Sequence, residues 1–321
     1  MKTAGTVVIF PGEDVGITPR ATAAVTTRGR RRPRVTGGAL KYIFLSLGSI
    51  VMIVPFVDML LGSLRTIPER LARPPVYLPA HPQWHNFVRV FHDLPMTQWL
   101  TNSVIVTTSI TLIQLLTSSA AGYALAKFRF RGRDLILRSI LGAQMFPFFL
   151  FLIPMFFILR FWPLAGGNNL LGQGGAGFLS SYAGLILPFA VSWYGIFMMR
   201  QFMVAIPDEL LDAARVDGAG ELRIFFTIVL PLARTALATL SIFVFIYQWN
   251  EVIWSMTATR IAPRLQTVPV GIFLMRQAFT DERTFSLQQA SLVVSILPVL
   301  VLFIFLQRYY VRGVTAGAVK G

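Results

Sequence analysis

The sequence predicts an all-α membrane protein with six transmembrane helices. Its mean hydropathy is +0.63, with 55% hydrophobic and only 13% charged residues, which is typical of a helix bundle in lipid. Six apolar runs are each long enough to cross about 30 Å of hydrocarbon. Lysine and arginine are concentrated in alternate connecting segments, as they are in multi-span proteins with a fixed orientation.

The chain divides into a tail, residues 1–38, and a transmembrane domain, residues 39–321. The tail carries no helical or strand periodicity and holds a basic run, Arg28 to Arg34, so we expect a disordered basic cytoplasmic segment. Next to an apolar run, these arginines favour anionic membrane lipid rather than nucleic acid as their partner. The following apolar stretch is too long for a cleavable signal peptide.

The six predicted spans alternate with loops of distinct composition. Pro55 is expected to bend the first span, and Pro147 and Pro154 interrupt the third. Residues 65–97 are polar and proline-rich, with a short helix expected near 84–91, and residues 259–286 are expected to be polar and external. The glycine-rich stretch 166–175 lacks the lysine and Ser/Thr of a nucleotide-binding loop, so we interpret it as a flexible external loop. The predicted spans are 40–64, 100–126, 135–159, 182–203, 232–258 and 287–309.

Counting basic residues gives the expected orientation of the chain. Of 29 lysines and arginines, 20 lie in the segments 1–41, 127–138, 200–234 and 308–320. The other nine lie in 65–97, 160–181 and 259–286. Because cytoplasmic loops carry the excess of positive charge, both termini are expected in the cytoplasm.

A charged island interrupts the apolar sequence at 206–231. Pro207 with Asp208 and Glu209 indicates a helix start, because acidic side chains suit the positive end of the helix dipole. We expect Leu210, Leu211 and Ala214 on its apolar face, a turn at Gly218, and a second short helix that ends at Pro231. On that second helix the expected apolar face is Leu222, Phe225, Phe226 and Val229. The island therefore predicts a helix-turn-helix on the membrane surface that is suited to binding by another protein.

The same residues resemble the Glu-Ala-Ala loop of ABC importer permeases. The matching positions are Asp212-Ala213-Ala214, then Asp217-Gly218-Ala219, then Ile228 to Pro231. Asp212 stands where that family has glutamate, which keeps the charge and shortens the arm. The resemblance implies a type I ABC importer permease fold with a cytoplasmic coupling hairpin at 206–231. The residues expected to couple to an ATPase are Glu209, Asp212, Ala213, Ala214, Asp217, Gly218, Ala219 and Pro231.

Three further stretches resemble the carbohydrate branch, in particular the shorter permease subunit of maltose-type importers. They are Gly122 to Phe130, Trp249-Asn250-Glu251 and the ending Gln307 to Gly321. The resemblance implies translocation of a sugar across the plasma (inner) membrane of a prokaryote. It also implies a second permease subunit in a heterodimer, an ABC ATPase dimer and an extracytoplasmic sugar-binding protein, with ATP and Mg bound by the ATPase subunits and no cofactor bound by this chain.

Catalytic and metal chemistry are not apparent in the sequence. There is no Walker loop, no cysteine and no metal-ligand pattern around the three histidines, so we expect a transport subunit and not an enzyme. An ion-coupled secondary transporter is the main alternative, with Asp58 and Glu251 as its only candidate intramembrane carboxylates. A non-sugar ABC permease is another alternative, and a scaffold or channel would leave the Asp-Gly hairpin unexplained.

The fifth predicted span ends in a polar and aromatic cluster. Polar side chains within a span usually face the bundle interior or a water-filled cavity, and aromatic rings stack on sugar faces. This pattern predicts that the cluster borders the translocation path, while helix packing and interfacial anchoring are the alternative. The cluster is Tyr247, Gln248, Trp249, Asn250, Glu251 and Trp254.

Overall fold

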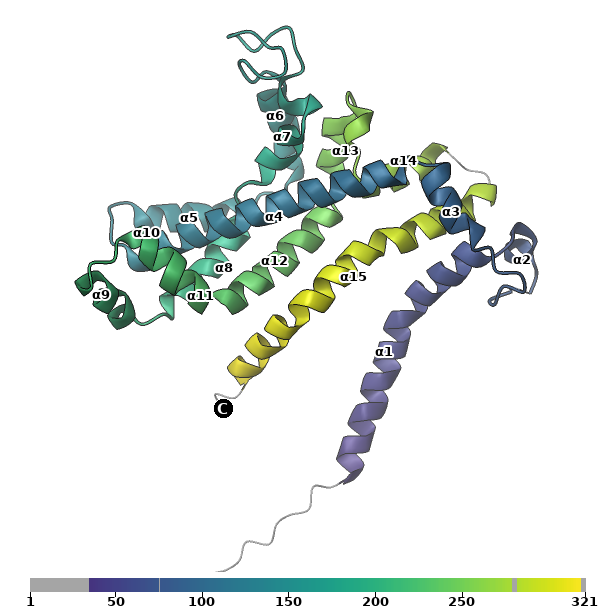
Figure 1. Cartoon of the computed structure of the whole chain (residues 1–321), viewed down its shortest axis with the longest axis horizontal. Helices are drawn as coiled ribbons and strands as arrows, with labels where there is room; N and C mark the ends of the chain where they lie inside the picture. The colour runs from purple at the N-terminus through teal and green to yellow at the C-terminus, as the bar shows by residue number, and fades with distance from the viewer. Residues whose placement is uncertain (1–34, 75, 279–281, 319–321) are drawn as a thin grey trace, which may run out of the picture. The chain divides into compact units, whose positions relative to one another are not determined.

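The computed structural model describes residues 35–74, 76–278 and 282–318, which form helices joined by loops, with no strand among them. Most of the predicted tail lies outside these residues. Helix α1 (Val35–Leu64) begins before position 38, so the last residues assigned to a disordered tail are helical instead. The chain divides into two compact units, one up to Met52 and one from Ile53 onward. Helix α1 belongs to both units, and the second unit contains all the other helices (Figure 1).

Three helices in the described part of the chain are long and apolar enough to cross a membrane. They are Leu40–Leu64 within α1, α4 (Met96–Lys127), and Thr284–Gln307 within α15 (Glu282–Ala318). Two further candidates are bent pairs: Tyr182–Phe189 with α8 (Trp193–Val204) at 47°, and Glu221–Leu232 with α12 (Arg234–Trp249) at 79°. The all-helical, multi-span class is thus confirmed, with three to five spans by length and composition.

The third predicted span is two short helices rather than one. Helix α5 (Arg133–Ala143) ends before Pro147, and α6 (Phe149–Arg160) begins after it. Proline lacks a backbone N–H and disfavours helical backbone in the residue before it, so the chain breaks there. Pro154, the other expected interruption, lies inside α6, which continues through it.

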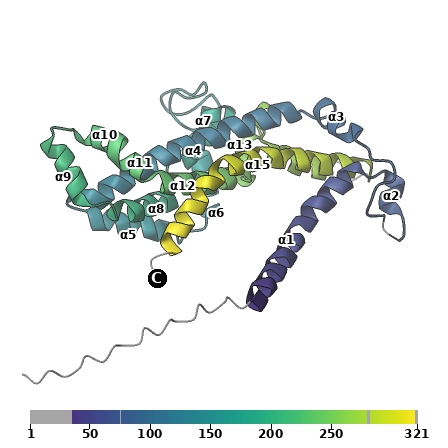
Figure 2. The same cartoon turned by 60° about the horizontal axis from the view of Figure 1, so that its bottom comes forward.

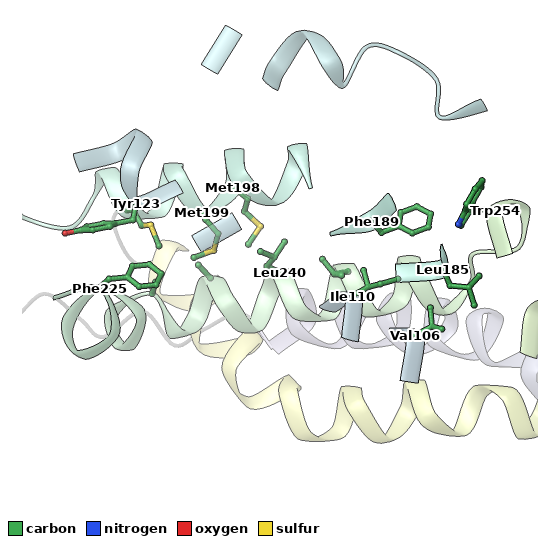
Figure 3. Packing of buried hydrophobic residues seen from close by; sticks show 14 of the residues in the cluster. Val106, Ile110, Tyr123, Leu185, Phe189, Met198, Met199, Phe225, Leu240 and Trp254 are labelled. Atoms are coloured by element: carbon green, nitrogen blue, oxygen red, sulfur yellow. The ribbon is translucent and has the colours of Figure 1, made fainter. Parts of the chain in front are cut away.

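Helix α4 is the centre of the packed bundle, with contacts to α8, α12 and α14 (Val268–Ala278). The main apolar cluster extends from Tyr123 and Phe225 at one end to Trp254 at the other, with Met199 and Leu240 between them (Figure 3). The buried face of α4 nevertheless carries many polar side chains: Asn102, Ser103, Thr107, Thr111, Gln114, Ser118 and Ser119.

Some polar side chains of α4 bind backbone groups that broken helices leave free. Gln114 Nε2 donates to the carbonyl of Phe189 at 2.6 Å, and Thr117 Oγ1 donates to that of Ala190 at 2.9 Å. Both carbonyls lie at the break between Tyr182–Phe189 and α8. Asn102 Nδ2 likewise donates to the carbonyls of Arg264 and Gln266, both at 2.8 Å. Because lipid offers no hydrogen bonds, an interrupted span needs such internal partners.

The segment 259–286 contains a buried apolar helix, contrary to its predicted polar character. Residues 268–278 form α14, whose buried Val268, Ile272 and Met275 join Trp99 and Leu287 in a second apolar cluster. A Cβ on Gly271 would lie 2.3 Å from the Trp99 ring, so only glycine permits this close packing. The apolar run is too short to read as a span, and the polar residues around it dominate the composition of the segment.

The glycine-rich stretch 166–175 is compact, contrary to the predicted flexibility. Asn168 Nδ2 donates to the carbonyls of Arg160 and Trp162 at 2.9 and 3.0 Å, and its Oδ1 accepts from the N–H of Gly175. Gly166 has φ +54, and a Cβ there would lie 2.0 Å from the carbonyl oxygen of Gly177. Glycine at position 166 therefore lets the backbone near Gly166 approach the backbone near Gly177 closely, rather than making the loop mobile.

The segment 65–97 contains α2 (Ile67–Leu71) and α3 (His85–His92), and α3 confirms the helix expected near 84–91. Thr66 and Glu69 form a capping box at the start of α2. The Glu69 carboxylate accepts from the N–H of Thr66 at 2.9 Å and from the N–H of Ala80 at 2.6 Å. These backbone hydrogen bonds, that of Thr66 first, lower the pKa of Glu69 to about 2.

We expect Glu69→Gln to loosen the segment 66–80 at neutral pH, because the amide replaces a charged acceptor of three hydrogen bonds. Trypsin should then cleave faster after Arg70, with Glu209→Gln as the matched control. The folded pKa lies below the usual 4.5, so the wild-type contribution is complete above that pH and fades as pH falls toward about 2. An unchanged cleavage rate would contradict the role of the carboxylate.

Candidate coupling hairpin and membrane groove

The charged island forms a helical hairpin at the end of the bundle where α4 ends and α5 begins (Figures 1 and 2). Its first helix is α9 (Asp208–Val216), preceded by Pro207 as the N-cap residue. The second is α10 (Glu221–Ile224), which continues through a π-helical segment (Phe225–Val229) into α11 (Leu230–Leu232). The order of helix, turn and helix matches the expectation from the sequence.

The turn between α9 and α10 is a Schellman motif centred on Gly218. The N–H of Ala219 donates to the carbonyl of Ala214 at 2.9 Å, and the N–H of Gly218 to that of Arg215 at 3.0 Å. Gly218 has φ +80, the left-handed conformation that this motif requires and that glycine adopts without strain. Ala214 and Ala219 are half-buried against the main cluster, which supplies the apolar contact that accompanies the motif.

The buried face of the hairpin differs in part from the predicted one. Leu211, Phe225 and Val229 are buried as expected, but Leu210, Leu222 and Phe226 are exposed. Ile224 is fully buried and replaces Leu222 in the core. The inward position at the start of α10 is occupied by the Glu221 carboxylate, which accepts hydrogen bonds and turns Leu222 outward.

Charged side chains hold both hairpin helices to the end of α4. Lys127 Nζ contacts Asp208 Oδ1 at 2.6 Å and the carbonyl of Ile206, which fixes the entry to α9. Tyr123 Oη donates to Glu221 Oε2 at 2.8 Å, which fixes the start of α10. The hydrogen bond from Lys127 lowers the pKa of Asp208, so this carboxylate is ionised at neutral pH.

Arg215 links the two hairpin helices to each other. Its Nε donates to Glu221 Oε1 at 2.7 Å, and its guanidinium also binds Asp212 Oδ1 at 2.7 Å. The bonds to Glu221 and then Asp212 raise the pKa of Arg215. Asp212, assigned from the sequence to an outside partner, therefore has an intramolecular partner within the hairpin.

The other predicted coupling residues lie on or near the outer face of the hairpin. Glu209, Ala213, Asp217, Gly218 and Pro231 are exposed. Sequence reasoning did not assign Tyr123, Lys127, Arg215 or Glu221 to this site. Tyr123 and Lys127 belong to the stretch Gly122 to Phe130, whose resemblance to the carbohydrate branch is the one sequence feature that points to them.

The span-five cluster is separated by the structure rather than gathered. Trp249 Nε1 donates to the Ser295 carbonyl of α15 at 3.1 Å, and Trp254 Nε1 donates to the Gly184 carbonyl of α7 (Tyr182–Ile186) at 3.0 Å. Asn250 is exposed and binds the carbonyl of Ile246 in its own helix. Only Tyr247 and Gln248 line a shared groove.

Glu251 accepts hydrogen bonds at the start of α13 (Ile253–Thr259), where α12 has ended. Its oxygens accept from the N–H of Trp254 at 2.6 Å, the N–H of Ser255 at 2.9 Å and the hydroxyl of Ser255 at 2.7 Å. The carboxylate thus satisfies orphan donors at a helix N-terminus. This local role accounts for its position within an apolar region.

The groove lined by Tyr247 and Gln248 has a volume of about 600 Å³ and combines aromatic side chains with three glutamines. Phe148 and Phe189 stack at 5.8 Å on one side, while Gln114, Gln144 and Gln248 supply amides. Such a lining, apolar with a few amides, suits a small polar solute with apolar faces. The remaining lining residues are Ala143, Phe146, Phe151, Pro188, Val191, Ser192, Trp193, Tyr194, Phe243, Val244 and Tyr247.

Multiple apolar helices, interrupted spans and a surface hairpin define the class of a helical membrane permease. Residues 116–316 match the sequence profile of the binding-protein-dependent transport system inner membrane component family. The chain is 32% identical over 287 residues to the arabinooligosaccharides transport system permease protein AraQ of Bacillus subtilis, covering 88% of this chain and 95% of AraQ. It is 32% identical to the sulfoquinovosyl glycerol transport system permease protein SmoH of Agrobacterium fabrum, covering 89% and 95% of the two chains.

A solved bacterial ABC transporter involved in the import of the acidic polysaccharide alginate has the same fold, with a TM-score of 0.71 and 23% identity. The match covers 87% of this chain and 98% of that one. The chain belongs to the binding-protein-dependent transport system inner membrane component family. It is a permease component of an ABC importer, a membrane transport subunit rather than an enzyme.

Proposed function

We propose that this chain is the permease subunit of an ATP-driven importer that translocates a sugar delivered by an external solute-binding protein. The observation that carries the proposal is the hairpin, which is fastened to the bundle by Lys127 and Tyr123 and exposes an outer face around Glu209 and Ala213. Relatives named for arabinooligosaccharides and sulfoquinovosyl glycerol support a sugar or sugar conjugate as the solute.

In this proposal six helices span the plasma membrane of a prokaryote, with both termini and the hairpin in the cytoplasm. The distribution of 29 basic residues, most of them in alternate segments, supports this orientation. Three spans are the long helices, two are the bent pairs, and the sixth is supplied by α5 and α6 together. An amide of α4, that of Gln114, binds the bent pair that includes Phe189. Interrupted helices lining a polar cavity are a recurrent feature of transporters.

The proposed partners are a second permease subunit, an ABC ATPase dimer and an extracytoplasmic sugar-binding protein. ATP and Mg would be bound by the ATPase subunits. The predicted coupling residues Glu209, Asp212, Ala213, Ala214, Asp217, Gly218, Ala219 and Pro231 are proposed to form or support the surface that seats in an ATPase groove. The family description itself supports a partner that binds the solute.

The secondary-transporter alternative depends on carboxylates available for ion coupling. Asp58 contacts Arg65 at 3.1 Å, and Glu251 accepts three hydrogen bonds at the start of α13. Both carboxylates thus have local structural partners. This arrangement favours the ATP-driven reading, in which energy enters through the hairpin.

The test of the proposed function is reconstitution of the chain with its partner permease and ATPase in proteoliposomes. We expect solute uptake that requires internal ATP and the external binding protein, and co-purification of the ATPase with this chain. Uptake driven by an ion gradient without ATP would contradict the proposal. Co-purification alone does not depend on knowing the sugar, and it can be tried first.

The groove is proposed to border the translocation path, and cysteine labelling tests this assignment. The chain has no native cysteine, so one introduced residue reports on one position. We expect Tyr247→Cys, which is exposed in the groove, to react with an aqueous thiol reagent and to be protected by solute. Trp254→Cys, at a fully buried position, is the matched control and should stay unreactive. Absence of labelling at Tyr247 in every nucleotide state would contradict the assignment.

A further inference from the structure

We propose that Tyr123 and Lys127 are positioning residues that transmit movement of the hairpin to α4. The inference rests on the proposed function, because it assumes that an ATPase moves the hairpin. The chain joins the hairpin only to α8 on one side and to α12 on the other. The side chains that hold the hairpin are instead on α4, far away in the sequence. Tyr123 precedes its partner Glu221 by 98 residues, and Lys127 precedes its partner Asp208 by 81 residues.

Each anchor holds a different helix of the hairpin. Lys127 Nζ reaches the carbonyl of Ile206 and the carboxylate of Asp208, at the entry to α9. Tyr123 Oη reaches Glu221, at the start of α10. Because Arg215 binds Glu221 from α9, the two hairpin helices are linked to each other and to α4 at two points, so a movement of the hairpin also pulls on α4.

The contacts have the features of a firm joint rather than of surface charges. The Lys127 side chain is only 6% exposed, so its ammonium depends on these partners for solvation. The Tyr123 ring is buried and lies 5.6 Å from the Phe225 ring and 5.3 Å from the Phe128 ring. Figure 3 shows Tyr123 and Phe225 facing each other at the hairpin end of the apolar cluster.

Helix α4 also connects the anchors to the groove. Gln114, which lines the groove and binds the carbonyl of Phe189, is nine residues before Tyr123 on the same unbroken helix. At the usual rise of an α-helix that separation is roughly 13 Å. A displacement of the hairpin therefore reaches the groove through the single helix α4, in addition to the covalent route through α8, while the route through α12 passes a bend of 79°.

The experiment compares solute transported per ATP hydrolysed in the full reconstituted complex. Tyr123→Phe removes only the hydroxyl and keeps the ring contacts, and Lys127→Met removes the charge and keeps most of the volume. Matched controls are Tyr77→Phe and Arg131→Met, which change an exposed tyrosine and an exposed basic residue that make no contact with the hairpin anchors. We expect both test variants to insert, assemble and hydrolyse ATP, with about a fivefold fall in solute per ATP, as for loss of one hydrogen bond of ordinary strength.

A double-variant cycle separates a joint from independent packing effects. If Tyr123 acts through Glu221, Tyr123→Phe will lower the ratio much less in a Glu221→Gln background than in the wild type, whatever Glu221→Gln costs through its bond to Arg215. Lys127→Arg is expected to restore most of the coupling lost in Lys127→Met.

Three outcomes would overturn the inference. They are a wild-type transport ratio in both test variants, additive effects in the cycle, and failure of both variants to assemble, since a folding role would then suffice. Absence of ATP-dependent uptake by the wild-type complex would overturn the proposed function, and this inference with it. Wild-type uptake together with unaffected variants would overturn the inference alone.

Discussion

Replacement of Gly218 by valine is expected to abolish most solute transport without preventing membrane insertion. Gly218 has φ +80 and no atom within 4 Å of the position that a Cβ would occupy. The strain is therefore in the backbone and not in a collision, and it costs about 1–2 kcal/mol, more for a β-branched residue. The bundle core does not include Gly218, so the hairpin angle changes while the spans remain packed.

Two control variants separate backbone strain from the addition of a side chain. Gly218→Asn keeps a residue that tolerates the left-handed conformation, and it is expected to retain most transport. Gly220→Ala places a methyl group two residues away in open space and at φ −70, and it should behave as wild type. The measurements are ATPase co-purification and solute uptake. Full transport by Gly218→Val with the ATPase still bound would remove the hairpin angle from the coupling mechanism.

The elements that the sequence predicted well are those whose signal is local. The continuous runs within α1, α4 and α15 are longer than one bilayer crossing, and their hydropathy alone identifies them. Gly218 could be assigned to a turn from its position after Asp217, because helix termination depends on adjacent residues. The Schellman bonds then follow from the same local geometry.

The breaks within the other spans were harder to predict, because they depend on partners far along the chain. An interruption after Phe189 is acceptable only because Gln114 and Thr117 of α4 bind the freed carbonyls. The spacing of the polar residues in α4 does not indicate that their partners are the carbonyls of Phe189 and Ala190. For the same reason, the contacts of Tyr123 and Lys127 with the hairpin could not be inferred from spacing.

The span-five cluster shows a different limit. Its residues are adjacent in sequence, and adjacency suggested one shared surface. The helix ends at Trp249, and the chain then restarts at Ile253, so neighbouring side chains turn toward α15, α7 and the groove in turn. Composition can identify a polar segment in a span, but only the backbone path decides which of its residues meet.

Replacement of Gly166 by alanine is expected to disorganise the loop that joins α6 to the 3-10 helix η1 (Gly177–Ser180). The new Cβ would lie 2.0 Å from the carbonyl oxygen of Gly177, at a positive φ of +54. The added Cβ would meet backbone atoms of Gly177, so no side chain can move aside to relieve the overlap. Overpacking of this kind costs about 1–3 kcal/mol, in addition to the strain of the left-handed backbone.

The neighbouring Gly167 provides a control with the same backbone preference but with space. It has φ +86, and the nearest atom to an added Cβ is Gly175 Cα at 3.6 Å. Gly167→Ala should therefore have a smaller effect than Gly166→Ala. The loop exposes Leu164, Leu170 and Leu171, an apolar tip suited to contact with a protein.

The measurement is ATP hydrolysis by the reconstituted complex, with and without the solute-loaded binding protein. We expect Gly166→Ala to lose about tenfold of the stimulation, the change that corresponds to about 1.4 kcal/mol, while basal hydrolysis and insertion are retained. A rigid loop presents its apolar tip in one arrangement, and a disordered one must be ordered on binding at a cost in affinity. Equal stimulation of Gly166→Ala, Gly167→Ala and the wild type would instead mean that the compact loop is a spacer whose packing has no part in docking.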